Sequence, residues 1–386
     1  MRTLSSVASG LPPSGIRKFF DLVAAAKDVI SLGVGEPDFS TPEPIREVAI
    51  QALREGRTSY TSNSGTPECR EAISAYLQRL YGIEYRVTDE ILVTVGVSEA
   101  MDLAMRAILN PGDEVLVPEP CFVSYKPMAR LAGGCPVAVD LRPENDFRIS
   151  VADLEAAVSE RTRLLVISYP SNPTGAVMTR EELLPVAEFA AKHDLWVISD
   201  EIYDRLSYIS KPCCFATLPG MRERTITLNG FSKAFAMTGW RLGYACAPAE
   251  VISVMHRIHQ YGMMCAAILP QIAGAWALPN SDADVEAMRQ SYDERRQLIV
   301  SGFRSIGLTC FEPGGAFYAF PDITITGMDD EEFAERLLHE EKVAVVPGSA
   351  FGVSGKGHVR CCYAVSRQNI EEALTRMGRF VERHRG

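Results

Sequence analysis

Short runs of apolar and β-branched residues alternate with helical patterns between about residues 91 and 245. The apolar runs predict strands over Ile91–Val95, Glu114–Val117, Pro136–Val139, Leu164–Ser168, Trp196–Asp200, Thr225–Leu228 and Leu242–Ala245. Helices are predicted over Ser98–Leu109 and from a capping box, Thr179-x-x-Glu182, to about His193. This alternation favours an α/β fold with a mainly parallel sheet that helices cover on both faces.

The pattern changes after about Asn280. A long charged helix is predicted over Asp284–Ile306, and shorter elements follow it. They are Phe317–Phe320, Lys342–Val346, Val359–Ala364 and a terminal helix from about Gln368. A chain of 386 residues exceeds what one hydrophobic core usually supports. We therefore expect a second, smaller α+β domain at this end.

Composition and charge limit the classes of partner. The chain is 47% apolar and 23% charged, as is ordinary for a globular protein, and its formal charge is −10. That charge argues against nucleic acid or an anionic membrane surface as a partner. Residues 1–10 lack the apolar core of a secretory signal. The ten cysteines include no C-x-x-C motif, so we expect free thiols and a cytoplasmic location.

The segment Ile258–Ser281 contains no formally charged residue and is long enough to span a membrane. Pro270, Pro279 and several polar residues interrupt it, so we expect a buried segment at a domain or subunit interface instead. His256 and His259 have no third candidate ligand nearby in the sequence. They are expected on an amphipathic surface, and no metal site is predicted.

Polar side chains stand at the ends of several predicted strands. Ser98 and Asn172 follow two of them, Asp200 closes a third, and Lys233 follows the strand that ends at Leu228. Ligands of open α/β sheets bind beyond the carboxyl ends of the strands. We therefore expect these side chains to share one site.

The residue types at this edge suit a pyridoxal phosphate pocket. Lys233 can form an imine with an aldehyde, and its neighbours Phe231 and Phe235 argue against a simple exposed loop. Asp200 ends a strand that should be buried, where an unpaired carboxylate is costly, so it can hold the proton of a pyridinium. The plainer alternatives are a surface lysine and a helix N-cap aspartate.

A phosphate site is predicted next to that lysine. Val97 and Ser98 begin a helix directly after a strand, so backbone N–H groups and the helix dipole favour an anion there. Ser232 and Arg241 would add donors. The same stretch, Gly96-Val97-Ser98-Glu99-Ala100, almost spells the G-x-S-x-G nucleophile elbow of α/β-hydrolases. A serine hydrolase using Ser98 with His339 or His358 remains a remote alternative, because it leaves Lys233 and Asp200 unexplained.

An arginine stands inside another apolar strand. Arg360 lies in His358-Val359-Arg360-Cys361-Cys362, where a guanidinium requires an anion. Gly35 would let the backbone approach the same anion closely. Arg367 falls at the start of the terminal helix and is expected on the surface.

Five motifs in order resemble the fold-type I, class I/II aminotransferases over nearly the whole chain. They are Gly33-Val34-Gly35-Glu36-Pro37-Asp38-Phe39, Asn172-Pro173-Thr174-Gly175, Asp200-Glu201-Ile202-Tyr203, Ser232-Lys233 with Arg241, and His358-Val359-Arg360. The resemblance implies a large domain with a mainly parallel seven-stranded sheet and a smaller α+β domain. It divides the chain into a segment 1–45 that packs with the small domain, a large domain 46–280 and a small domain 281–386.

The resemblance also implies roles for individual residues. Lys233 would be the Schiff-base lysine and the base that moves the substrate Cα proton. Asn172, beyond its turn role, and Tyr203 would reach the phenolic oxygen of the cofactor, and Arg360 would bind the substrate α-carboxylate. Phe122 would stack on the cofactor ring, although an ordinary core phenylalanine is an alternative.

Tyr60 resembles the tyrosine that reaches the phosphate of a neighbouring subunit, which implies a homodimer with active sites at the interface. A core aromatic is the alternative. Ile16 and Phe19, with the apolar segment Tyr261–Met264, would tolerate aromatic or aliphatic substrates, and Lys126 could serve a dicarboxylate.

The sequence thus predicts a pyridoxal phosphate-dependent aminotransferase that works by a ping-pong mechanism. Expected substrates are small molecules, namely an amino acid of the aspartate, aromatic or glutamate type and a 2-oxo acid such as 2-oxoglutarate. A C–S lyase on the same fold is the alternative, because it shares every residue named above.

Overall fold

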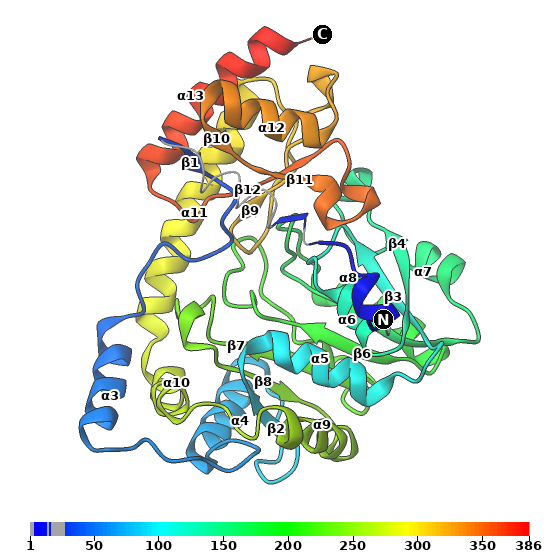
Figure 1. Ribbon diagram of the computed structural model, residues 1–386, viewed down its shortest axis with the longest axis vertical. Helices are drawn as coiled ribbons and strands as arrows, with labels where there is room; N and C mark the ends of the chain where they lie inside the picture. The colour runs from blue at the N-terminus through cyan, green and yellow to red at the C-terminus, as the bar shows by residue number, and fades with distance from the viewer. Residues whose placement is uncertain (1–3, 14, 17–27, 386) are drawn as a thin grey trace.

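A seven-stranded sheet forms the centre of the protein, in a computed structural model that describes residues 4–13, 15–16 and 28–385. The strand order is β2-β8-β7-β6-β5-β3-β4 (Figure 1). The strands are β2 (Ile91–Thr94), β3 (Glu114–Glu119), β4 (Cys135–Asp140), β5 (Thr162–Ile167), β6 (Trp196–Asp200), β7 (Thr225–Gly230) and β8 (Gly243–Cys246). β8 pairs antiparallel with β2 and β7, and the other neighbours pair parallel. The predicted α/β class with a mainly parallel sheet is confirmed.

Helices cover both faces of this sheet because its central strands are apolar on both sides. In β3, Val115 and Val117 pack with one group of helices, whereas Leu116 packs with another. The first group is α5 (Gly96–Ile108), α6 (Tyr125–Leu131) and α9 (Ala249–Gly262). The opposite face carries α7 (Val151–Ala157), α8 (Arg180–Lys192), α4 (Pro67–Tyr81) and α10 (Ile268–Asn280). α3 (Glu43–Arg54) packs on α10, and α1 (Ser6–Ser9) lies near α6.

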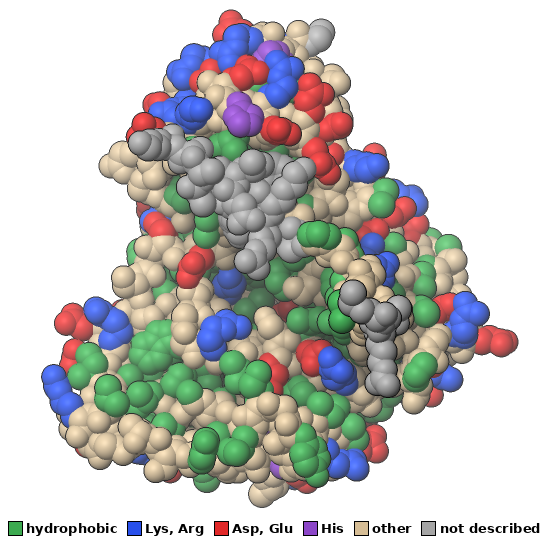
Figure 2. All heavy atoms as spheres, viewed as in Figure 1, with side chains coloured by type: hydrophobic (Ala, Val, Ile, Leu, Met, Phe, Trp, Pro, Cys, Tyr) green, Lys and Arg blue, Asp and Glu red, His purple; other side chains and the backbone are tan. Residues whose placement is uncertain are grey.

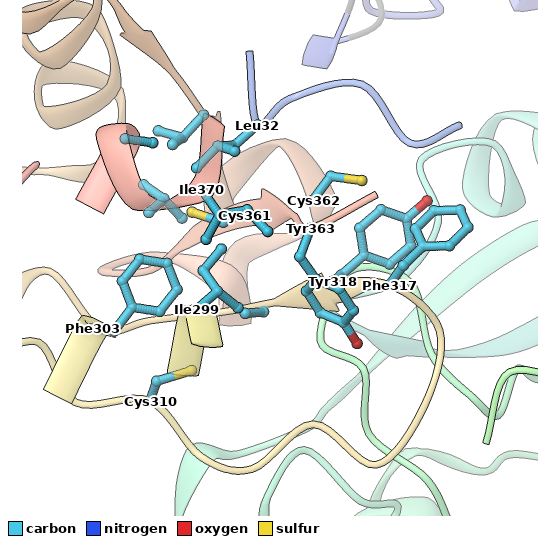
Figure 3. Packing of buried hydrophobic residues seen from close by; sticks show 14 of the residues in the cluster. Leu32, Ile299, Phe303, Cys310, Phe317, Tyr318, Cys361, Cys362, Tyr363 and Ile370 are labelled. Atoms are coloured by element: carbon cyan, nitrogen blue, oxygen red, sulfur yellow. The ribbon is translucent and has the colours of Figure 1, made fainter. Parts of the chain in front are cut away.

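Two small sheets build the upper part of the molecule in Figure 1. β1 (Ile30–Ser31) pairs with β10 (Val343–Ala344), and β11 (Val346–Pro347), β12 (Val359–Cys362) and β9 (Tyr318–Ala319) form an antiparallel sheet. The helices here are α11 (Asp282–Ser305), α12 (Asp330–Glu341) and α13 (Arg367–His384). Leu32 joins their core, so the chain around residue 30 packs with the C-terminal region (Figure 3). The division into 1–45, 46–280 and 281–386 stays a prediction.

The predicted strand Lys342–Val346 is wrong in one respect. Lys342 ends α12 in a left-handed conformation, and the apolar run after it forms two strands in two different sheets. Because every residue of Val343–Val346 is buried, the hydrophobic pattern carries no sign of the change of partner. The other predicted elements are present, with ends shifted by one or two residues.

The uncharged segment Ile258–Ser281 divides into the end of α9, a short connection and α10. No helix in the described ranges is long and apolar enough to cross a membrane. α10 is partly buried, as expected, but Tyr261 and Met263 are 88% and 53% exposed. The expectation of a surface position for His259 is wrong. His259 is fully buried because α9 packs on α5. The Nδ1 of His259 lies 2.6 Å from Oε1 of Glu99, a residue of α5.

The capping box of α8 yields a stability prediction. Thr179 Oγ1 accepts from the Glu182 N–H at 3.3 Å, and Glu182 accepts from the Thr179 N–H at 2.8 Å. Thr179→Ala is expected to lower the free energy of unfolding by about 1 kcal/mol, measured by urea denaturation. The control is Thr375→Ala on the exposed side of α13, expected to change it by less than about 0.5 kcal/mol. Equal losses in both variants would contradict a capping role.

Candidate functional site

A cavity of about 780 Å³ lies beyond the carboxyl ends of β5, β6 and β7, where the start of α5 and the sheet β11-β12-β9 meet them. Its wall contains the site residues expected from the sequence, except Tyr60, Lys126 and the segment Tyr261–Met264. These residues are Ile16, Gly35, Val97, Ser98, Phe122, Asn172, Asp200, Tyr203, Ser232, Lys233, Arg241 and Arg360. Tyr60 is 82% exposed and stands outside this wall, which excludes the core alternative. Phe19 lies outside the described residues.

Asp200 brings a carboxylate into the floor of the cavity. It is the last residue of the buried strand β6, and no helix begins there, so it is not an N-cap. Its Oδ2 accepts from the Tyr125 hydroxyl at 2.8 Å, and its Oδ1 from the Ile202 N–H at 3.3 Å. Burial raises the pKa of Asp200 to about 6, and the Tyr125 hydrogen bond only partly offsets this. A cationic partner at this carboxylate would hold it ionised.

Lys233 follows β7 and reaches across the cavity. Its Nζ donates to the Gly35 carbonyl at 2.8 Å. Burial lowers the pKa of Lys233 to about 8, and the positive charges of Arg360 and Arg241 act in the same direction. About a tenth of the Lys233 side chains are therefore free amines at pH 7, far more than for an ordinary lysine, and a nucleophile or a base requires this form.

The start of α5 and Arg241 form a cradle for an anion. Arg241 has a left-handed backbone (φ 53°), and its guanidinium lies against Gly96, where an added Cβ would come 2.6 Å from Nη2. The guanidinium donates to the Thr238 carbonyl at 3.2 Å. Val97 and Ser98 lie in the first turn of α5, whose N–H groups have no partner inside the helix. Arginine, hydroxyl and helix N-terminus together suit a phosphate monoester.

Arg360 forms a second anion site at the opposite side. It is 2% exposed on β12, and donates to Asn172 Oδ1 at 2.9 Å and to the Gly33 carbonyl at 2.6 Å. Its Nε has no hydrogen-bond partner. The hydrogen-bond acceptors of this buried cation are thus neutral oxygens, so its charge is not compensated. A substrate carboxylate could supply the opposite charge.

The charges of the cavity fit pyridoxal phosphate and an amino acid. Lys233, Arg241 and Arg360 line it, and within the described ranges none of them forms an ion pair with a carboxylate. A phosphate at Arg241, a carboxylate at Arg360 and a pyridinium at Asp200 would each supply the missing opposite charge. The donors and the buried carboxylate on the wall therefore fit this cofactor.

Two tyrosines of the wall were missed as site residues. Tyr125 donates to Asp200, and the hydroxyl of Tyr318 lies 2.7 Å from that of Tyr203. Both fall inside stretches that resemble the family, three residues after Phe122 and directly after Phe317. Tyr125 and Tyr318 are almost fully buried, as core aromatics are. The sequence therefore gives no sign that they line the cavity.

Two alternative assignments fail on geometry. No histidine contributes to the described wall around Ser98, and His358 stacks on Phe320 and bonds to the Lys356 carbonyl instead. The hydrolase alternative therefore lacks a base. Lys126 forms an ion pair with the buried Glu119 and is absent from the wall, so the expectation that it could bind a dicarboxylate is not supported.

Comparisons with known proteins agree with this chemistry. The profile of the family "Aminotransferase class I and II" matches residues 27–377. An aspartate aminotransferase of Pyrococcus abyssi is 49% identical over 372 residues, 96% of each chain. An aromatic-amino-acid aminotransferase of Thermococcus litoralis is 46% identical, again over 96% of each chain. The solved structure of a Thermus thermophilus aspartate aminotransferase with maleate has a TM-score of 0.94 at 41% identity, covering 98% of this chain and 100% of that one. The chain therefore belongs to the class I and II aminotransferases, transaminases that use pyridoxal phosphate.

Proposed function

We propose that this transaminase moves an amino group between an L-amino acid of the aspartate, aromatic or glutamate type and a 2-oxo acid such as 2-oxoglutarate, in a ping-pong cycle. The observation that carries the proposal is one cavity in which Lys233 lies between an anion cradle at Arg241 and a second anion site at Arg360. Similar proteins named for aspartate and for aromatic amino acids support this substrate range. They favour transamination over C–S lysis, which would use the same side chains.

Different wall residues would bind different parts of the cofactor. Ser98, Ser232 and Arg241 would bind its phosphate, and Asp200 would hold the proton of its ring nitrogen. Asn172 and Tyr203 would bind its phenolic oxygen, and Phe122 would lie against its ring. Pyridoxal phosphate, when bound, supplies an electron-accepting ring that stabilises negative charge at the substrate Cα.

Lys233 would carry the proton steps. Its amine can take a proton from the substrate Cα and return it at a neighbouring atom, because burial keeps its pKa close to neutral. The Gly35 carbonyl holds the amine in place. A ping-pong cycle uses this base twice, once for the amino acid and once for the 2-oxo acid.

The apolar wall would set the preference for the side chain. Ile16, Val123 and Met128 line the cavity, and aromatic or aliphatic groups would pack against them. The described wall offers no cation beyond Lys233, Arg241 and Arg360. We therefore expect aromatic substrates to bind more tightly than aspartate.

We further propose a homodimer that completes the site. Half of the exposed large hydrophobic side chains that the structure describes lie on α3, in the segment after it, or at the end of α9 and directly after it; they are Ile50, Leu53, Tyr60, Tyr261, Met263 and Met264. Asn63 donates to the Met264 carbonyl at 2.6 Å and so joins the Tyr60 segment to the segment after α9. Hydrophobic side chains gather over this lower part of the molecule (Figure 2). A second copy of the chain would cover them and bring its Tyr60 to the phosphate cradle.

The cytoplasm is the proposed location. All ten cysteines are free thiols, and most are buried. This state is compatible with a reducing compartment and gives no reason to expect structural disulfides.

A substrate panel tests the proposed activity. Tyrosine, phenylalanine, glutamate or aspartate is expected to bleach the visible absorption of the cofactor-loaded protein, and 2-oxoglutarate is expected to restore it. Lys233→Ala is expected to lower the rate by about 10³-fold or more, because it removes the base. The matched control is Lys211→Ala on an exposed loop, expected to leave the rate unchanged. Activity on small neutral amino acids alone would refute the substrate range.

The pKa of Lys233 predicts how cofactor loading depends on pH. Its free amine forms as pH rises through about 8, so the association rate of pyridoxal phosphate is expected to rise about tenfold from pH 7 to 9 and then level off. Stopped-flow absorbance measures this rate. Nα-acetyl-lysine, which keeps a free ε-amine of ordinary pKa, is the control in the same buffers for the titration of the cofactor. A rate that rises with the control up to pH 10 would show an unperturbed lysine.

The dimer has its own test. The double variant Tyr261→Asp with Met263→Asp is expected to halve the mass measured by light scattering, because two carboxylates would be buried without partners. Ile209→Asp, at a residue 55% exposed on another loop, is the matched control and should keep the mass of the unmodified protein. A single-chain mass for the unmodified protein would contradict the dimer.

A further inference from the structure

Arg360 is held in an environment that its hydrogen bonds alone do not explain. The guanidinium has five N–H donors, yet the described contacts account for two of them, to Asn172 Oδ1 and to the Gly33 carbonyl. The side chain is 2% exposed, and its Nε has no partner. A long arginine side chain with so few polar contacts needs another constraint to keep one orientation.

Two aromatic rings provide that constraint. The Arg360 guanidinium carbon lies 4.6 Å from the centroid of the Tyr318 ring and 4.9 Å from that of Phe351. Guanidinium groups are weakly hydrated and stack on aromatic faces, and the attraction strengthens when water is excluded. Both rings are almost fully buried, so these contacts lie in a dry environment.

The small sheet places one ring-bearing segment on each side of the arginine strand. In the order β11-β12-β9, Val346 of β11 pairs with Arg360 and Tyr318 of β9 pairs with Cys362. Phe351 closes the short 3-10 turn Gly348–Phe351 that follows β11. Strand pairing fixes Tyr318, and a hydrogen bond from the Cys121 N–H to the Phe351 carbonyl at 2.9 Å holds the turn that carries the second ring.

Tyr318 is itself held firmly. Its hydroxyl lies 2.7 Å from the Tyr203 hydroxyl, and its ring packs edge-on against Phe317 at one end of the buried cluster (Figure 3). Gly35 leaves room for this ring, since an added Cβ would come 2.5 Å from the Tyr318 hydroxyl oxygen. A ring fixed in this way can fix the plane of the guanidinium.

We propose that Tyr318 and Phe351 are positioning residues that hold the Arg360 guanidinium in the orientation required to bind the substrate carboxylate. The inference rests on the proposed function only in taking Arg360 as the carboxylate site. Bidentate recognition of a carboxylate depends on the plane of the arginine fork. If the guanidinium could turn freely, binding would have to order it first. The affinity for the carboxylate would then fall more than the rate at which bound substrate is turned over.

Carboxylate binding can be measured without turnover. The cofactor-loaded protein is titrated by calorimetry with 3-phenylpropanoate and with 3-phenylpropanamide, its neutral analogue. Tyr318→Leu and Phe351→Leu are each expected to raise the Kd of the carboxylate about tenfold and to change that of the amide by less than about twofold. In parallel, the KM for tyrosine should rise more than kcat falls. In Phe351→Leu, whose ring does not line the cavity, the affinity for pyridoxal phosphate should stay unchanged.

Two controls separate positioning from general loosening of the core. Phe333→Leu removes a buried ring of the same core that packs on Phe380, so it should lower thermal stability but leave the carboxylate-to-amide ratio intact. Tyr318→Phe keeps the ring and its packing against Phe317, so it should weaken carboxylate binding less than Tyr318→Leu does.

The outcomes distinguish this inference from the proposed function. Equal weakening of both ligands, an unchanged ratio in Tyr318→Leu and Phe351→Leu, or an unmodified protein that binds neither ligand would overturn the positioning role. If both ring substitutions weaken the binding of 3-phenylpropanoate as expected, but the protein transaminates no member of the substrate panel, the proposed function alone would be overturned.

Discussion

Three cations held in one cavity without carboxylate partners are the constraint on which the rest of the site depends. Arg360 is almost fully buried, Lys233 is half-buried and Arg241 is exposed, and in the described chain only neutral oxygens receive their hydrogen bonds. A buried guanidinium without an opposite charge is costly, so Arg360 carries most of this constraint. Burial of the lysine, together with the charges of Arg360 and Arg241, lowers the pKa of Lys233 to about 8. A phosphate or a carboxylate in the cavity would supply the opposite charges that these groups lack.

The fold distributes these charges over independent elements. Arg241 and Lys233 follow β7 of the seven-stranded sheet, whereas Arg360 comes from β12 of the small antiparallel sheet. Lys233 lies in the loop after β7, Arg241 ends the 3-10 turn Thr238–Trp240, and Arg360 lies within β12, so separate parts of the backbone position the three charges. Burial raises the pKa of Asp200 to about 6, and the Tyr125 hydrogen bond and the charge of Lys233 partly offset this rise, so the carboxylate belongs to the same electrostatic site.

The sequence predicted the sheet and most of the wall because both follow local rules. Strand ends in an α/β sheet collect polar side chains, and Asp200, Asn172 and Lys233 stand at such ends. The predictions from sequence failed where residues distant in the chain decide which strands pair and which side chains are buried. Nothing in the run Val343–Val346 reveals that its halves pair with β1 and with β12. His259 has the local pattern of a surface residue and becomes buried only because α5 brings Glu99 to it. Tyr318 likewise has the sequence pattern of a core residue. Only the structure shows that β12 places Arg360 against its ring.

The strap that runs from Gly33 to Thr41 joins the two halves of the site. The Gly33 carbonyl accepts from Arg360, and the Gly35 carbonyl accepts from Lys233. Farther along, the Thr41 hydroxyl donates to the Ala236 carbonyl in the loop that carries Lys233. The strap is continuous with β1, which pairs with β10 of the C-terminal region. Two carbonyls with one residue between them, those of Gly33 and Gly35, therefore accept from Arg360 and from Lys233. Because the α-carboxylate and the amino group of an amino acid share one carbon atom, this short backbone link fits the proposal that Arg360 binds the carboxylate while Lys233 acts beside the amino group.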